Sequence, residues 1–250
     1  MEGKAAMENI TKEEARRFAI EDAVRNAVEE VVGVNVLAET LVLNFRTAGD
    51  IIRAIPYGKV VEKKVIDEGV KELREKERGN LSLIYWVKIR AKVKKEKGEA
   101  DPYFKIAEAN LNREVFKEGD DMVIKVTPTR DCYINIFNIL EDESVLILTP
   151  NRYKATNFIK AAETFTFPDE EDKKRGIGLE VHALGGKKTV ETIYILCFKQ
   201  PVRFDNQKFQ EGVYGVYTGQ TAFITDLIKE IIEIPLSERA EKFIQYSLVR

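Results

Sequence analysis

The chain has 250 residues and 44% of them are hydrophobic, which is enough for one large domain or two modest ones. Its formal net charge of −2 argues against a nucleic-acid partner, because nucleic-acid-binding proteins usually carry a basic excess. No apolar run approaches the length that crosses a bilayer, so we expect no membrane span.

The first element is a long helix, which we expect within residues 2–33. Thr11 is a good N-cap and Glu14 follows three residues later, the spacing of a capping box. Gly33 is placed to end the helix. Apolar residues recur at the spacing that turns one face to a core: Ala15, Phe18, Ala19, Ala23, Ala27 and Val31, widened by Ile20, Val24, Val28 and Val32. The many alanines indicate close packing against a sheet.

After the first helix, the sequence pattern predicts an extended segment, a short second helix and two strands joined as an antiparallel hairpin. These elements span residues 34–45, 47–54, 59–67 and 81–93, and residues 69–79 connect the two strands. The second strand alternates cleanly between two faces. We expect the face with Leu81, Leu83, Tyr85, Val87, Ile89, Ala91 and Val93 to lie under the first helix. Two helices on a small antiparallel sheet make an α+β domain.

A charged, turn-rich stretch at residues 94–102 is the best linker candidate. It separates a domain at residues 1–98 from a second one at residues 99–250. The second domain is rich in short strands, at residues 122–127, 132–140, 145–149, 164–167, 178–183 and 192–198. We expect an amphipathic helix at residues 221–233, a helical turn at 237–241 and a closing strand at 243–249. This spacing of strands predicts a β-sandwich.

The opening segment resembles the N-terminal domain of the flagellar assembly protein T family and related small envelope lipoproteins. The resemblance covers about the first 95 residues. It rests on Glu2-Gly-Lys-Ala5, Glu14-Ala-Arg16, Ala19-Ile-Glu-Asp-Ala23, Asn26-Ala27, Gly33-Val34, Glu39-Thr40 and the strand entry at Gly58. The other domains of that assembly protein have no counterpart here, so a flagellar role is not implied by the whole chain.

The second domain resembles an uncharacterised bacterial family of domains of unknown function, found in extracytoplasmic proteins and fused to protein kinases and caspase-like peptidases. The matching residues are Phe116, Gly119-Asp120, Arg130-Asp-Cys-Tyr133 into Ile139, Leu148-Thr-Pro-Asn151 and the stretch from Phe165 to Pro168. The two resemblances imply a periplasmic or otherwise extracytoplasmic protein whose full-length form could carry a lipid anchor. Residues 1–4 lack the basic start and apolar stretch of a signal peptide, so a trimmed mature form and a cytoplasmic protein both stay open.

Three candidate chemical sites have simpler structural interpretations. The cysteines, Cys132 and Cys197, predict two buried thiols or, alternatively, a cross-strand disulfide. His182 is the only histidine, and we expect it solvated or packed at a strand edge rather than catalytic. The acidic run at residues 169–172 could offer oxygen ligands to calcium or magnesium, but it lacks the spacing of a calcium loop. We therefore expect a solvated loop there, with no metal, no cofactor and no catalytic residue.

The most interesting surface is the outer face of the strand at residues 81–93, where an aromatic residue adjoins a basic row. It comprises Ile84, Trp86, Lys88, Arg90 and Lys92, and Lys94 continues the row. Such a surface could contact a protein partner or an anionic envelope polymer. The structural alternative is a covered tryptophan beside lysines that keep the sheet soluble.

The sequence as a whole favours a non-enzymatic cell-envelope protein that assembles or scaffolds other envelope proteins. The alternative is a module whose β-sandwich recognises a ligand or a peptide. A hydrolase with an unrecognised site is the third hypothesis. A pocket in the sandwich would distinguish the second hypothesis from the first, and a polar constellation with perturbed acids or bases would favour the third.

Overall fold

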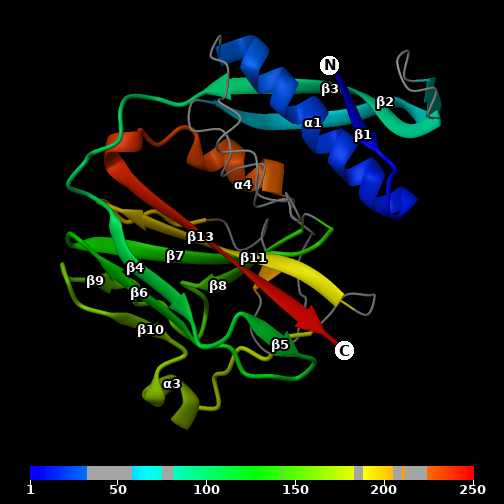
Figure 1. Cartoon of the computed structure of the whole chain (residues 1–250). Coiled ribbons are helices and arrows are strands. Elements are labelled where there is room, and N and C mark those ends of the chain that lie inside the picture. Colours follow the sequence, from blue (N-terminus) through cyan, green and yellow to red (C-terminus); the bar gives the residue numbers. More distant parts are fainter. Residues whose placement is uncertain (33–57, 75–80, 143, 183–187, 205–209, 212–223) are drawn as a thin grey trace. The chain divides into compact units, whose positions relative to one another are not determined.

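The computed structural model describes residues 1–32, 58–74, 81–142, 144–182, 188–204, 210–211 and 224–250. Among these residues, one unit runs to Glu96 and a second begins at Lys97, within the predicted linker. Figure 1 labels most elements of both units, and each unit is described by itself. No helix of the described residues is both long and apolar enough to span a membrane.

The described residues of the first unit form a helix on a three-stranded antiparallel sheet. Helix α1 (Lys12–Val32) lies across strands in the order β1 (Glu2–Ala6), β3 (Leu81–Lys95) and β2 (Gly58–Arg74) (Figure 1). The predicted helix and the predicted hairpin are confirmed. Both strands of the hairpin are longer than the sequence pattern indicated, and residues 75–80 of the connection lie outside the described part.

The capping box at the start of α1 is present. The backbone N–H of Thr11 donates to Glu14 Oε2 at 2.8 Å, and the backbone N–H of Glu14 donates to Thr11 Oγ1 at 3.1 Å. The alanine stripe then packs on the sheet face predicted to lie under the helix, but the prediction is wrong for Leu83 of that face, which is 44% exposed. The shared core contains Ala15, Ala19, Ala23, Val24, Val28, Tyr85, Val87 and Ile89. Small side chains let the helix backbone approach the strands closely.

Two further expectations for this unit need correction, and three others fall outside the described residues. Residues 2–6 form a strand rather than helix, because they pair with β3 from Glu2↔Lys88 to Ala6↔Ile84. Val31 is 43% exposed, because Val24 and Val28 occupy the core-facing positions of the stripe. The predicted extended segment at 34–45, the second helix at 47–54 and Gly33 lie outside the described residues.

The second unit is a β-sandwich-like arrangement of two open sheets, which confirms the predicted α+β class. One sheet has the order β10-β6-β4, and the other has the order β12-β8-β7-β11-β13-β5, with β9 also pairing with β7. The strands are β4 (Ile106–Leu111), β5 (Val115–Lys117), β6 (Ile124–Pro128), β7 (Cys132–Ile139), β8 (Val145–Thr149), β9 (Phe158–Ile159), β10 (Phe165–Phe167), β11 (Lys188–Phe198), β12 (Gln210–Glu211) and β13 (Arg239–Val249). Their inward side chains form one core, which includes Ile124, Val126, Ile134, Ile136, Ile193 and Ile195.

In the described residues of this unit, the helical elements are α3 (Glu170–Lys174), α4 (Ile224–Ile231) and the 3₁₀ turn η2 (Leu236–Glu238). The stripe predicted for α4 is buried at Ile224, Leu227, Ile228, Ile231 and Ile232.

Several boundaries in this unit differ from prediction. The strand expected at 178–183 is wrong within the described residues 178–182, where only an isolated bridge joins Glu180 to Asp121. The closing strand begins at Arg239 and the helical turn is η2, because β13 pairs with β11 along its whole length. Strands β4, β5 and β9 were not expected, since each is short or mostly polar.

Candidate functional site

A hollow of about 430 Å³ opens at one edge of the sandwich, and we call it the edge hollow. Its lining consists of residues 153–156, 158–159, 163–166, 169, 171–172 and 175. It therefore lies between β9, which belongs to one sheet, and β10, which belongs to the other. The volume falls in the range of pockets that hold small ligands, about 300–1,000 Å³.

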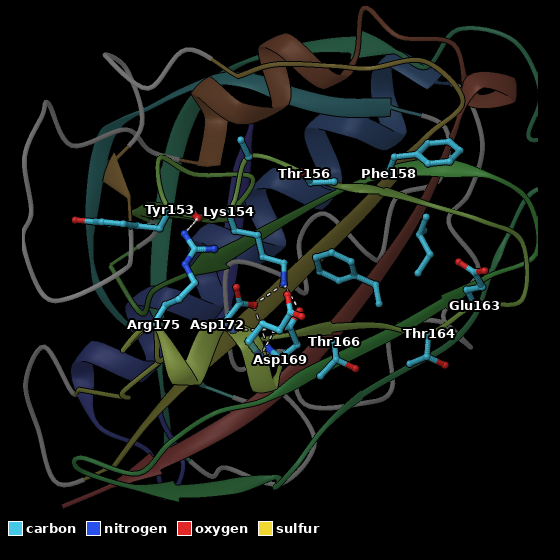
Figure 2. A pocket seen from close by; sticks show the side chains of 14 residues that line it. Tyr153, Lys154, Thr156, Phe158, Glu163, Thr164, Thr166, Asp169, Asp172 and Arg175 are labelled. Carbon is cyan, nitrogen blue, oxygen red and sulfur yellow. Dashed lines mark hydrogen bonds and ion pairs between the residues drawn. The ribbon is translucent and has the colours of Figure 1, made fainter.

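Strand β10 forms one wall of the edge hollow because its residues alternate between the core and the outside. Phe165 and Phe167 are buried in the sandwich core, whereas Thr164 before the strand is exposed and Thr166 is half-buried. Figure 2 shows the two threonine side chains next to each other on this wall. Among the strands that the structure describes, β10 pairs with β6 alone and is the last strand of its sheet.

The floor of the edge hollow is set by Lys154 and the first turn of α3. Asp169 is the N-cap of α3, and Asp172 completes a capping box by accepting from the backbone N–H of Asp169 at 3.0 Å. Lys154 Nζ lies 2.6 Å from Asp169 Oδ2 and also donates to Asp172 Oδ2, as the dashed lines in Figure 2 show. The same ammonium lies 5.5 Å from the ring centroid of Phe165.

This triad corrects the expectation of a solvated acidic loop at residues 169–172. Asp172 is only 3% exposed, because its carboxylate is enclosed by Lys154 and the turn of α3. The hydrogen bond from Lys154 holds the pKa of Asp169 below its ordinary value, so this carboxyl group stays ionised. The ammonium group of Lys154 stands where a bound cation would otherwise contact the two carboxylates. Among the described residues, no group of three or more side chains is arranged to hold a metal ion.

The rim of the edge hollow combines aromatic and acidic side chains. Phe158 is 45% exposed and Tyr153 is 39% exposed, which is high for large apolar rings. The lining includes four carboxylates and two cations, which gives it a formal net charge of −2: Glu163, Asp169, Glu171 and Asp172 against Lys154 and Arg175. Arg175 is also committed to the protein, because its Nη2 donates to the backbone oxygen of Tyr153 at 3.1 Å. The accessible surface is therefore acidic and partly aromatic.

Comparison with protein families places the edge hollow inside a known type of domain. Residues 115–196 match the domain of unknown function DUF4384. The match covers about a third of the chain and includes every residue of the edge hollow. It agrees with the resemblance noted for the second domain, and it supports nothing about the first 95 residues or a flagellar role. No curated protein matches the chain.

The predicted partner surface lies outside the DUF4384 match, on β3 of the first unit. Ile84 and Trp86 are half-buried, while Lys88, Arg90 and Lys92 are exposed. Trp86 is partly covered by its own sheet, because Lys71 Nζ lies 4.0 Å from its ring centroid.

Acidic residues on neighbouring strands accompany the basic row of this surface. Lys92 Nζ lies 3.4 Å from Glu62 Oε1. Lys88 stands between its register partners, Asp67 on β2 and Glu2 on β1. The five predicted residues share one face, but their charge is partly balanced within the sheet, and their role in binding stays a prediction.

His182 lies near one end of the DUF4384 match and is exposed. Its Nδ1 is 3.1 Å from Glu118 Oε1, and its Nε2 is 3.2 Å from Glu180 Oε1. The side chains of all three residues are at least 38% exposed. This arrangement agrees with a solvated histidine that is tied to surface carboxylates.

The two cysteines are free thiols buried in the sandwich core. Contact with Cys132 and burial raise the pKa of the Cys197 thiol far above its ordinary value. Because the thiolate is the reactive form, Cys197 acts as a small apolar group in this core, and Cys132 is buried in the same core. The alternative of a cross-strand disulfide is not present in the structure.

A buried carboxyl group on β11 was missed by the sequence analysis. Glu191 Oε2 accepts hydrogen bonds from Asn138 Nδ2, at 2.9 Å, and from the hydroxyl of Tyr246. Within the described part of the chain, Glu191 Oε1 and Asn138 Oδ1 have no hydrogen-bond partner. The sequence could have indicated this burial, because Glu191 lies on the same face of the strand as Ile193, Ile195 and Cys197. The predicted strand began one residue too late to include Glu191.

Proposed function

We propose that this protein is a non-catalytic binding module, in which the DUF4384 domain holds a ligand in the edge hollow. The observation that carries the proposal is the hollow itself, because it joins ligand-sized volume to exposed aromatic rings and an acidic rim. Solvent-exposed aromatic side chains of this kind are common anchors in binding sites. Of the hypotheses drawn from the sequence, the ligand- or peptide-recognising module is the one that such a hollow favours.

The charged groups of the edge hollow favour binding over catalysis. An acid–base catalyst works best when its pKa lies near the working pH. The pKa of Asp169 moves the other way, because Lys154 stabilises the carboxylate. Lys154 is itself held between two carboxylates, so its ammonium group is already engaged by the floor of the edge hollow.

The proposal includes a place in the cell envelope, where the module would recognise or scaffold other envelope proteins. Its support is the resemblance of the second domain to domains of extracytoplasmic proteins. Fractionation of the source cells with an antibody to this chain tests it. Recovery with the periplasmic or membrane fraction is expected, and recovery with cytoplasmic markers would contradict it.

The binding function is tested by titrating the ¹⁵N-labelled full chain with a mixture of small aromatic amines and short peptides. We expect chemical-shift changes at residues 153–175, and mass spectrometry of the mixture should recover every compound unchanged. Changes confined to other parts of the chain would overturn the proposal. Conversion of any compound would instead indicate an enzyme.

A further inference from the structure

Strand β10, which forms one wall of the edge hollow, is an edge strand of its sheet. Strand β10 pairs with β6, and no other strand of the described residues pairs with its far side. An edge strand presents backbone N–H and C=O groups that can accept another strand. Thr164, Phe165 and Thr166 at this edge also line the hollow, so a strand added here would occupy it.

The chain itself keeps the two walls of the edge hollow in separate sheets. Strands β9 and β10 are consecutive along the chain, yet β9 pairs with β7 and β10 pairs with β6. The turn between them contains Ala162 with a positive φ of 62° and is closed by the Glu163 N–H, which donates to the Lys160 oxygen at 3.2 Å. This turn therefore closes one end of the edge hollow between β9 and β10, and Glu163 lies at that end.

We propose that the edge hollow takes an extended peptide that adds a strand to β10 and carries a lysine or arginine side chain. This inference rests on the proposed binding function and names the class of its ligand. Backbone hydrogen bonds to β10 would supply affinity that does not depend on the peptide's sequence. The side chains of the hollow would then select the peptide.

Charge complementarity selects a basic peptide residue. Glu163 and Glu171 are exposed carboxylates of the lining, and Asp169 is half-exposed. Of the two cations of the lining, Lys154 is enclosed between Asp169 and Asp172, and Arg175 donates to the backbone oxygen of Tyr153, so the four carboxylates still outnumber the cations. A basic side chain near Glu163 would meet an acidic surface with a formal charge of −2.

The exposed rings select an apolar residue at a second position. Side chains on one face of a strand recur every two residues, which is about 6.6–6.8 Å. Phe158 and Tyr153 offer two separate aromatic surfaces on the rim, as Figure 2 shows for their positions around the hollow. A peptide with an apolar and a basic residue two positions apart would thus present both side chains to the lining on one face.

The test uses the full chain and a positional library of blocked heptapeptides, with binding measured by calorimetry and by ¹⁵N shifts. The best peptide should shift residues 153–175. Replacing its basic residue by norleucine should weaken binding about fivefold, the effect of an exposed ion pair. Methylating the backbone nitrogens that face β10 should weaken binding at least about tenfold, because each removes a hydrogen bond.

Two protein variants test whether the carboxylate of Glu163 binds the basic residue of the peptide. Glu163→Gln should weaken binding of the basic peptide about threefold and leave binding of the norleucine peptide unchanged. Glu170→Gln is the matched control: this exposed residue of α3 pairs with Lys173 at 2.9 Å and does not line the hollow. It removes the same charge from the same region, and binding should not change.

The outcomes separate this inference from the proposed function. Binding of small aromatic amines, but of no peptide, at residues 153–175 would overturn the peptide inference and leave the binding function standing. Peptide binding that is indifferent to backbone methylation would overturn strand addition. No binding at these residues by any compound would overturn both.

Discussion

Glu191 places a carboxyl group inside the sandwich core, and its ionisation should make folding depend on pH. Burial is the main reason that its pKa lies above the ordinary value of 4.5, and the nearby acids Glu141 and Asp142 raise it further. Hydrogen bonds from Tyr246 and Asn138 act in the opposite direction but do not cancel the effect of burial.

Whether the free energy of unfolding rises or falls with pH depends on which state, native or unfolded, binds the proton of Glu191 more tightly. Above about pH 4.5 the unfolded chain releases the proton of Glu191 while the native protein retains it. The contribution of Glu191 to the free energy of unfolding is therefore fully present below that pH. It is lost as pH rises, until the native group also ionises. Glu191→Gln should remove this loss, so the variant should gain stability over the parent protein as pH rises.

Urea unfolding of both proteins at about pH 4.5 and about pH 8 measures this difference. Glu108→Gln is the control, because Glu108 is exposed on β4. That substitution should not change the pH dependence. An equal offset between Glu191→Gln and the parent at both pH values would contradict the assignment.

The first strand shows how an element can be fixed by what it packs against. Residues 2–6 have no strand-like alternation, but β1 pairs with β3 and is tied to α1 by the backbone N–H of Lys4, which donates to Asp22 Oδ2 at 2.9 Å. Gly3 is buried where β1 meets the helix. A Cβ there would overlap the backbone of Ala19 and Ala23.

Gly3→Ala should therefore destabilise the first unit by about 3 kcal/mol, at the upper end for overpacking, because neither backbone can move away easily. Chemical unfolding monitored by the fluorescence of Trp86, the only tryptophan, reports on this unit directly. Lys4→Ala, on the neighbouring exposed position of the same strand, should change stability by less than about 0.5 kcal/mol. Equal effects of the two substitutions would show that β1 does not pack as described.

The turn at α3 depends on a buried ion pair. Lys154→Met would leave Asp172 nine-tenths buried without its cation, which typically costs roughly 3–5 kcal/mol. Lys173→Met, which removes the exposed partner of Glu170, should cost less than about 1 kcal/mol. Thermal unfolding compares the two variants. A small effect of Lys154→Met would mean that solvent reaches Asp172 and that the floor of the edge hollow is not rigid.

Across the whole molecule, the sequence predicted elements with strong local periodicity. The alanine stripe of α1 and the alternation of β3 identified both the elements and the faces that meet, because each pattern repeats over many residues. The strands β5 and β9 could not be predicted, because pairing with distant strands decides the conformation of these two or three residues.

The edge hollow could not be predicted for a related reason. Its walls come from β9, β10, the loop at residues 153–156 and α3, and only the tertiary fold brings them together. The acidic run at 169–172 was visible in the sequence, but its true partner, Lys154, lies fifteen residues before Asp169 in the chain. Nothing in the sequence indicated that this lysine would neutralise the run.

The most direct test of the central claim is the affinity of the full chain for its best library ligand after Phe158→Ala. Phe158 is an exposed ring on the rim, and its loss should weaken binding about tenfold if the edge hollow is the binding site. Tyr103→Ala is the control, because Tyr103 is 72% exposed outside the hollow. Calorimetry, with melting temperatures to confirm folding, should show a loss for Phe158→Ala alone. Unchanged affinity in Phe158→Ala, or equal losses in both variants, would contradict a binding site in the edge hollow.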